Sequence, residues 1–389
     1  MKKNVSIIND CYGCGVCTKA CGKKLIHLNL DANGFYKPII NHPEECIECN
    51  LCLDVCACNH QDLSSKGIPL STMATWSNNP TTRENCSSGG VGYEIAKKML
   101  ESGYKVAAVK YNVDKKRAEH YITHNEEELQ ASRGSKYLQS FTEDCWREIN
   151  RKDKFFIVGT PCQIDSMRRY AQRMKCEENF IFMDFFCHGV PSYLMWNVYL
   201  NFQQSKLGKI SSIAWRNKKY GWHDSWCMTI SDSDNKTILS RLSGGDMFYR
   251  MFLGDFCSNV ACQKKCKYKY LSSAADIRIG DCWGRKFQNN HEGVSCLVAF
   301  TEKGKNVIDS LDTQITKEYY PMDVIAEYQM RKNAGRAYLA KIAWKMLLSS
   351  KSYKESTWKK LIIIEALLHL PERVLNKFCK IIKGKISII

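Results

Sequence analysis

Short apolar runs alternate with helix-like segments through the middle of the chain. The runs of strand length are Tyr104–Tyr111, Phe155–Gly159, Phe180–Phe186, Asp276–Gly280 and Val294–Phe300. The segments with helical patterning are Gly90–Glu101, Cys162–Arg173 and Ser192–Gln204. This alternation favours a sheet covered by helices, with ligands bound beyond the carboxyl ends of the strands. We therefore expect a mixed α/β domain over residues 67–329.

The first 66 residues contain a repeat of cysteines instead. Two runs with the spacing C-x2-C-x2-C-x3-C are Cys11, Cys14, Cys17, Cys21 and Cys46, Cys49, Cys52, Cys56. This is the spacing of bacterial-type ferredoxins with two 4Fe-4S clusters, in which the fourth cysteine of each run binds the other cluster. The predicted ligand sets are therefore Cys11, Cys14, Cys17 with Cys56, and Cys46, Cys49, Cys52 with Cys21. The alternative is a pair of zinc sites, which more often use two spaced pairs of ligands.

The remaining features of this repeat carry less weight. Gly22 and Ala57 stand where the ferredoxin pattern has proline, which removes no ligand. Cys58 is an extra cysteine, and we expect it to be a small buried residue. A polar stretch from Ser64 to Gly67 predicts a linker after the repeat.

The last 60 residues, 330–389, form a basic and helix-like tail. They contain 14 Lys or Arg and 3 Glu, so they hold most of the formal charge of +17. Apolar clusters occur at Leu361–Ile364 and Leu367-Leu368, Pro371 interrupts them, and Val374–Ile382 resumes them. Basic residues mixed with apolar ones suit an anionic membrane surface, whereas two helices packed on the protein body are the alternative. Because the rest of the chain is only mildly basic, we expect no nucleic-acid partner.

These patterns together predict an α+β protein. Its expected parts are a dicluster ferredoxin-like domain (1–66), a mixed α/β domain (67–329) and a basic helical tail (330–389). The amino-terminal residues do not resemble a signal peptide, and 21 cysteines suit metal binding in a reducing compartment. We expect a cytoplasmic protein, with peripheral binding to the inner face of the membrane as the variant that the tail suggests.

Further cysteines follow the apolar runs of the middle region. Thr160 and Pro161 are helix-start residues, so Cys162 is expected in a first helical turn, where free amides favour a thiolate. Cys187 and His188 follow the next run, and Cys262 and Cys266 come later.

These stretches resemble the beta subunits of coenzyme F420 (deazaflavin) hydrogenases and dehydrogenases. The similarity extends from about Thr72 to Phe300 and includes Ser87-Ser88-Gly89-Gly90, Gly134-Ser135-Lys136-Tyr137 and Arg216 to Trp222. Many members of that family carry the same two-cluster ferredoxin domain.

The resemblance implies an FAD-binding domain with a third 4Fe-4S cluster near the flavin. Residues that would approach FAD are Ser88, Gly89, Gly90, Ser135, Lys136 and Thr160. Ligands of the third cluster would be Cys162, Cys187, Cys262 and Cys266, although the last pair is spaced x3 where the family has x2, which makes Cys257 a possible substitute. Catalytic or substrate-binding side chains would be His188, Arg216 and Lys218.

Each of these residues also has a structural interpretation. Gly89-Gly90 suits an ordinary turn into a helix, and Cys162 and Cys187 suit buried free thiols. His188 suits a structural histidine, and Arg216 and Lys218 suit a solvated strand end. No role is assigned to Cys86, Cys145, Cys176, Cys227, Cys282, Cys296 or Cys379.

The function that fits best is an iron–sulfur flavoprotein oxidoreductase that couples hydride chemistry at FAD to one-electron transfer. The leading hypothesis is a stand-alone, ferredoxin-linked reductase or dehydrogenase of an organic substrate, conceivably sugar-linked. The second is an electron-relay subunit of a hydrogenase-like complex that uses coenzyme F420. The third is a non-enzymatic interaction module with structural clusters.

Overall fold

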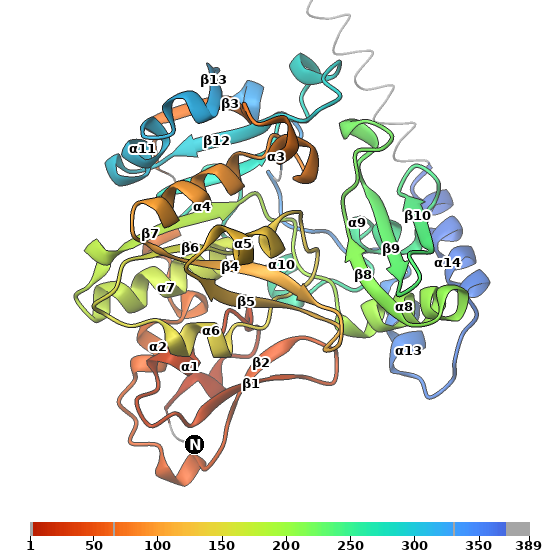
Figure 1. Cartoon of the computed structure of the whole chain (residues 1–389). Helices are drawn as coiled ribbons and strands as arrows, with labels where there is room; N and C mark the ends of the chain where they lie inside the picture. The colour runs from red at the N-terminus through yellow and green to blue at the C-terminus, as the bar shows by residue number, and fades with distance from the viewer. Residues whose placement is uncertain (1–2, 65–66, 330, 371–389) are drawn as a thin grey trace, which may run out of the picture.

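A computed structural model describes residues 3–64, 67–329 and 331–370 (Figure 1). Its centre is an eight-stranded sheet with the order β13-β3-β12-β11-β7-β6-β4-β5. The inner strands β11, β7, β6 and β4 pair in parallel, and the outer strands pair antiparallel. The strands are β3 (Ser71–Ser77), β4 (Lys105–Asn112), β5 (Arg117–Thr123), β6 (Phe155–Val158), β7 (Phe180–Phe185), β11 (Ile277–Asp281), β12 (Ser295–Ala299) and β13 (Ile315–Tyr319).

Helices cover both faces of this sheet because its inner strands are apolar on both sides. Phe156 packs with α4 (Val91–Glu101) and α11 (Glu302–Asp309) on one face. Its neighbours Phe155 and Ile157 pack with α6 (Glu143–Glu148) and α7 (Pro161–Arg173) on the other. Successive residues of a strand point to opposite faces, so a continuous apolar run serves two cores.

The mixed α/β architecture predicted from the apolar runs is confirmed. All five runs are strands, and the three helical segments correspond to α4, α7 and α8 (Tyr193–Leu207). The strands β3, β5 and β13 were not anticipated, because their polar residues and outer positions give a weaker apolar signal.

A second cluster of elements lies beside the central sheet (Figure 1). A three-stranded antiparallel sheet packs with α8, α9, α13 and α14 around Trp196, Trp215 and Phe248. Its elements are β8 (Ile210–Ala214), β9 (Cys227–Asp232), β10 (Thr237–Arg241), α9 (Met247–Leu253), α13 (Ala340–Leu348) and α14 (Glu355–Leu368). The part of the basic tail up to residue 370 is therefore packed on the protein, whereas the predicted segment Val374–Ile382 lies outside the described residues.

The amino-terminal region packs below α6 and α7 (Figure 1). It consists of the hairpin β1 (Ile26–Leu30) and β2 (Tyr36–Ile40) with the short helices α1 (Val16–Ala20) and α2 (Leu51–Asp54). Val16, Ala20 and Val55 belong to the same apolar cluster as Trp146 and Ile164. The remaining short helices are α3 (Pro80–Asn85), α5 (Glu126–Leu129), α10 (Val260–Lys264) and α12 (Met322–Ile325). The bounds of the three predicted domains stay predictions.

Candidate redox site

The first set of thiols lies in the interior, between the amino-terminal region and α7. It comprises Cys11, Cys14, Cys17 and Cys56, all of them buried. Burial and the neighbouring thiolates of Cys11 and Cys56 raise the pKa of Cys14 to about 12. The same neighbours act on Cys17, so the four thiols share one site. The structure thus brings together the crossed set in which Cys56 joins the first cysteine run.

Cys58 belongs to this neighbourhood, which the sequence analysis did not anticipate. Its thiol is hydrogen-bonded to the thiols of Cys11 and Cys56 and lies 3.5 Å from the carbonyl oxygen of Asp10. The bond from Cys58 is the main reason why the pKa of Cys56 falls to about 7. Cys58 is therefore a fifth thiol of the first set rather than only a small core residue.

The second set of thiols lies nearer the surface. Cys21, Cys46, Cys49 and Cys52 line one cavity of about 320 Å³, whose other walls include Leu25, Ile26 and Ile40. Cys49 is exposed, whereas Cys52 is buried. An apolar cavity with four convergent thiols has the donor set and surroundings that a cubane cluster requires.

The third set gathers cysteines from four separate places in the fold. Cys162 stands in the first turn of α7, Cys187 follows β7, Cys262 is in α10, and Cys266 follows that helix. The thiolates of Cys187 and Cys262 add to burial in raising the pKa of Cys162, and that of Cys266 acts on Cys187. Cys257 packs instead in the core around α8 and α9. The structure thus brings together the implied third set without Cys257.

The spacing of the thiols disfavours a single metal ion at each set. Thiolates at about 2.3 Å from one zinc ion lie within about 4 Å of each other. Within the described ranges, no three cysteines have their sulfur atoms within 4.8 Å of one another. In a cubane each thiolate binds a different iron atom, so wider spacing suits a cluster.

Single residues connect the three sets. The thiolate of Cys52, in the second set, contributes to raising the pKa of Cys17 in the first set. The thiolate of Cys14 likewise contributes to raising the pKa of Cys162 in the third set. Ser166 on α7 accepts a hydrogen bond from Cys14 (3.2 Å) and another from the amide of Ala57 (3.1 Å). The three sets therefore form a series of neighbouring sites from the surface to the central sheet.

Tyr12 lies between the first and third sets. Burial and then the thiolates of Cys58, Cys162, Cys266 and Cys262 raise its pKa. Its hydroxyl donates to the carbonyl oxygen of Lys265 at 2.5 Å, and its ring meets that of Tyr268 edge-on at 6.0 Å. Nothing in the spacing of the cysteines pointed to this residue.

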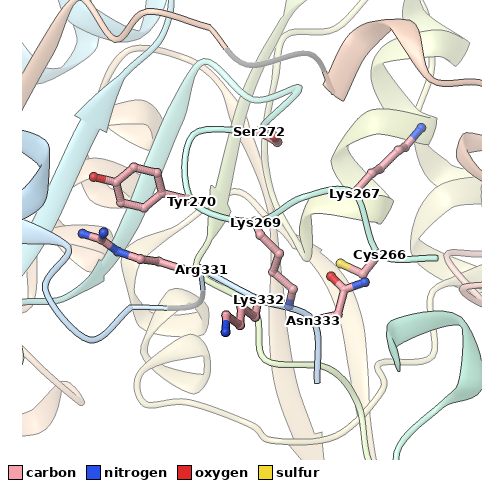
Figure 2. A pocket seen from close by; sticks show the side chains of 8 residues that line it. All are labelled: Cys266, Lys267, Lys269, Tyr270, Ser272, Arg331, Lys332 and Asn333. Carbon is pink, nitrogen blue, oxygen red and sulfur yellow. The ribbon is translucent and has the colours of Figure 1, made fainter. Parts of the chain in front are cut away.

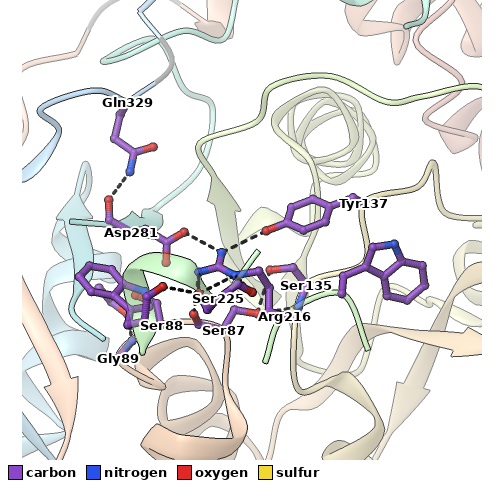
Figure 3. Close-up of polar contacts among 12 residues, drawn as sticks. Ser87, Ser88, Gly89, Ser135, Tyr137, Arg216, Ser225, Asp281 and Gln329 are labelled. Atoms are coloured by element: carbon purple, nitrogen blue, oxygen red, sulfur yellow. Dashed lines mark hydrogen bonds and ion pairs between the residues drawn. The ribbon is translucent and has the colours of Figure 1, made fainter. Parts of the chain in front are cut away.

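The two segments expected to approach a flavin lie together (Figure 3). The amide of Ser135 donates to Ser87 Oγ at 2.8 Å, and Ser88 Oγ donates to the carbonyl oxygen of Val294 at 2.8 Å. At Gly89, a Cβ atom would lie 2.6 Å from the carbonyl oxygen of Thr75, so the close approach to β3 requires glycine. Gly90 has a φ of 81° at the start of α4, the turn that the structural interpretation expected.

Arg216 is buried in the same region and donates several hydrogen bonds (Figure 3). Its guanidinium donates to Ser225, to the hydroxyl of Tyr137 (3.1 Å) and to the carbonyl oxygen of Ser87 (3.1 Å). It pairs with Asp281 at 3.3 Å. The rings of Trp226 and Trp283 lie 5.2 and 5.1 Å from it. Arg216 is therefore no solvated strand end, and its substrate-binding role stays a prediction.

The two lysines expected near a cofactor are also bonded to carbonyl groups. Lys218 donates to the carbonyl oxygens of Arg83 and Ser88, and burial lowers its pKa to about 8. Lys136 donates to the carbonyl oxygens of residues 131–134, and burial lowers its pKa to about 7. An anion bound here would meet both ammonium groups only if some of these bonds were exchanged.

His188 lies beside the third set and is held by a partner distant in sequence. Its Nε2 is 2.8 Å from Asp255 Oδ1, and its ring meets Phe252 edge-on at 5.2 Å. Phe252 also contacts Tyr137, with ring centroids 5.6 Å apart. Phe252 therefore contacts both His188 and the segment that contains Tyr137.

Thr160 caps the amino end of α7. Its amide donates to Gln163 Oε1 at 2.8 Å, and its Oγ1 lies 3.2 Å from Cys162 Sγ. This position places Thr160 next to the third set, whereas its predicted contact with a flavin stays untested.

Two models of one family match the sequence. The amino-terminal model of the coenzyme F420 hydrogenase/dehydrogenase beta subunit matches residues 72–143, and the carboxyl-terminal model matches residues 152–323. Together they span more than half of the chain. The chain belongs to this family.

Other comparisons add little. The F420-reducing [NiFe] hydrogenase complex of Methanosarcina barkeri contains a chain of similar structure, with 15% sequence identity and a TM-score of 0.47. The match covers 74% of this chain and 91% of that chain. A search of curated proteins gives no match.

Family membership confirms the resemblance and places the chain among the iron–sulfur oxidoreductase subunits of redox complexes. Within the described residues, no helix has the length and apolar character needed to cross a bilayer.

The sequence analysis missed Cys58, Tyr12, Asp255, Asp281 and Lys269 as members of the site. Lys269 was within reach of such reasoning, because it stands in the basic run that surrounds Cys266. Cys58 was also within reach, because it stands two residues after Cys56. Tyr12, Asp255 and Asp281 are ordinary residues whose partners are far away in the chain.

Proposed function

We propose that this chain is an electron-relay subunit that connects coenzyme F420, acting at a bound FAD, with a partner redox protein. The family assignment supports this function over the stand-alone reductase that led our expectations. None of the comparisons points to a sugar-linked substrate.

The observation that carries the proposal is the series of three neighbouring thiol sets. It begins at exposed Cys49, continues through Cys52 and Cys17, and passes from Cys14 to Cys162. Iron–sulfur clusters bound there would supply one-electron steps, and a flavin would couple them to hydride exchange. A series that joins the surface to the interior is what a relay needs, whereas a purely structural role requires no such order.

The end of the series supports a flavin near the third set. Phe252 contacts both His188 and Tyr137, with ring centroids 5.2 and 5.6 Å apart. Arg133, in the loop before Ser135, stacks on Tyr93 at 4.2 Å and has a buried Nε without a partner among the described residues. A buried donor left unsatisfied is costly, so an acceptor such as a flavin phosphate fits this place.

The chain's own side chains have distinct tasks in this proposal. Asp255 accepts a hydrogen bond from Nε2 of His188 and so fixes the orientation of its ring. Lys218 and Lys136 supply positive charge beside the segments Ser87–Gly90 and Gly134–Tyr137. Arg216 holds these segments together through Ser87 and Tyr137.

Spectroscopy of the anaerobically purified chain tests the proposal. We expect about 12 iron atoms and about one FAD per chain, with flavin reduction by reduced F420 followed by bleaching of the clusters. Stopped-flow absorbance at flavin and cluster wavelengths measures both steps. If F420 fails while another organic substrate reduces the flavin, the stand-alone enzyme is correct. If the clusters never change redox state, the chain is instead a non-enzymatic interaction module with structural clusters.

We also propose that an anionic membrane surface is a partner of the tail. Ile363, Ile364, Leu367 and Leu368 on α14 are about half exposed, next to the exposed Lys359 and Lys360. Trp358, Leu361 and Ile362 of the same helix are buried, so truncation before α14 would damage the core. The triple variant Ile363→Ser/Ile364→Ser/Leu367→Ser is the sharper test. Vesicle sedimentation equal to that of the unchanged chain would contradict this contact.

A further inference from the structure

A basic cavity of about 320 Å³ opens beside the third thiol set (Figure 2). One wall comes from the segment after Cys266, with Lys267, Lys269 and Tyr270. The other comes from Arg331, Lys332 and Asn333, about sixty residues later in the chain. The lining contains four cationic side chains and no carboxylate, and its volume is at the lower end of the range for small-ligand sites.

The two inner lysines hold the cavity wall in place. Lys269 donates to the carbonyl oxygens of Cys187 (2.7 Å) and His188 (3.2 Å). Lys267 donates to the carbonyl oxygens of Ala57 and His60. Hydrogen bonds to neutral carbonyl groups position both ammonium groups without cancelling their charges. Of these two lysines, Lys267 alone has an ion pair among the described residues, with Asp165 at 3.5 Å, which also pairs with Arg169.

The two outer cations are differently placed. Arg331 and Lys332 are exposed, and Arg331 lies over the ring of Tyr270 at 4.6 Å. No ion pair to either side chain occurs within residues 3–64, 67–329 and 331–370. Figure 2 shows Lys332 and Asn333 near the end of Lys269, with Arg331 against Tyr270 on the other side.

Charge balance of the third thiol set explains only part of this arrangement. Lys269 is bonded to the loop that carries Cys187 and therefore lies near the thiolates. Arg331 and Lys332 come from another segment and line the same cavity, where they add charge that the thiolates do not require. Four cations line this small concave site, and three of them, Lys269, Arg331 and Lys332, have no ion pair among the described residues. Such a lining favours a ligand with several negative charges.

We propose that this cavity binds a small polyanion that carries phosphate or carboxylate groups, in contact with the loop of Cys266. The site goes beyond the proposed relay, since its lining includes none of the residues expected to contact FAD. Arg331 supplies paired donors to one anionic group, and Lys332, Lys269 and Asn333 bind the next.

Equilibrium binding to the full-length, cluster-loaded chain tests this proposal. The probes are pyrophosphate and citrate, one for each source of charge, at about 0.15 M salt so that loose surface attraction is screened. We expect saturable binding of at least one probe, with one site per chain. The double variant Arg331→Ala/Lys332→Ala should weaken it by about tenfold or more, with iron content and circular dichroism unchanged.

The control is Lys341→Ala/Lys345→Ala, which removes two exposed cations from α13. An equal loss in this control, or no saturable binding of either probe, overturns the proposal. If neither probe binds but Lys332→Glu slows reduction by ferredoxin, the surface receives an acidic protein and the small-ligand site is wrong. The same binding is also measured after removal of the flavin. Binding that persists without flavin belongs to this cavity and does not depend on the relay function.

Discussion

The first and second thiol sets have the same cysteine spacing and very different surroundings. The first is buried against α6 and α7, where Cys14 is bonded to Ser166 and its carbonyl oxygen accepts from Thr142 and Trp146. The second lines an apolar cavity in which Cys49 is exposed. The difference indicates that the second set is suited to meet an external partner and the first to connect the interior. The two runs share one spacing, but their thiol sets differ in exposure because the first set lies deeper, against α6 and α7.

The largest effect should come from removing one ligand of each set. Cys14→Ala should lose about four irons and also weaken the packing of the amino-terminal region on α7, whereas Cys49→Ala should lose about four irons with little change in melting temperature. Cys14 is preferred to Cys56 because Cys58 is placed to replace the latter. Iron analysis and thermal melting measure both effects, and equal destabilisation would contradict the contrast between the sets.

Acid should act on the surroundings of the first set. His120 is buried, donates from Nε2 to the carbonyl oxygen of Val158 at 3.0 Å, and stacks near Trp146; burial lowers its pKa from 6.5 to about 4. The unfolded chain therefore binds more protons, so stability is full above pH 6.5 and falls between pH 6.5 and 4, by about 3 kcal/mol at most. Melting curves of the wild type and His120→Phe across this range should diverge, and parallel curves would exclude this histidine as the cause.

A smaller effect should follow from one hydrogen bond at the first set. Thr142→Val keeps the shape of the side chain but removes the bond to the carbonyl oxygen of Cys14, at a cost of about 1 kcal/mol. The matched control is the exposed Thr237→Val on β10. Denaturant unfolding monitored by tryptophan fluorescence compares the two. A cost no larger than that of the control would show that Trp146 alone holds this carbonyl group.

The smallest effect concerns Cys58. Cys58→Ser replaces its thiol with a hydroxyl, so the first set should retain its iron while the reduction potential changes, because hydrogen bonds to ligand sulfurs tune it. A redox titration followed by electron paramagnetic resonance measures the change. Loss of iron would instead identify Cys58 as a ligand, and an unchanged potential would mean that its bonds to Cys11 and Cys56 do not affect the cluster.

The sequence by itself was sufficient for the features that depend on local spacing. The cysteine repeat predicted both amino-terminal thiol sets and their crossing, because close spacing confines three ligands to one loop. The continuous apolar runs predicted β4, β6, β7, β11 and β12, because strands buried on both faces are apolar throughout. The start of α7 was predictable because Thr160 and Pro161 are both residues that favour a helix start.

Only the tertiary structure decided how distant segments meet. The exclusion of Cys257 from the third set, the pairing of His188 with Asp255 and the enclosure of Arg216 by Trp226 and Trp283 depend on the packing of elements far apart in the chain. The basic cavity is of the same kind, since residues 266–272 meet residues 331–333 there. Spacing along a sequence constrains neighbours within a loop or a helix turn, whereas contacts between segments follow from the burial of whole faces of a sheet, which no local pattern records.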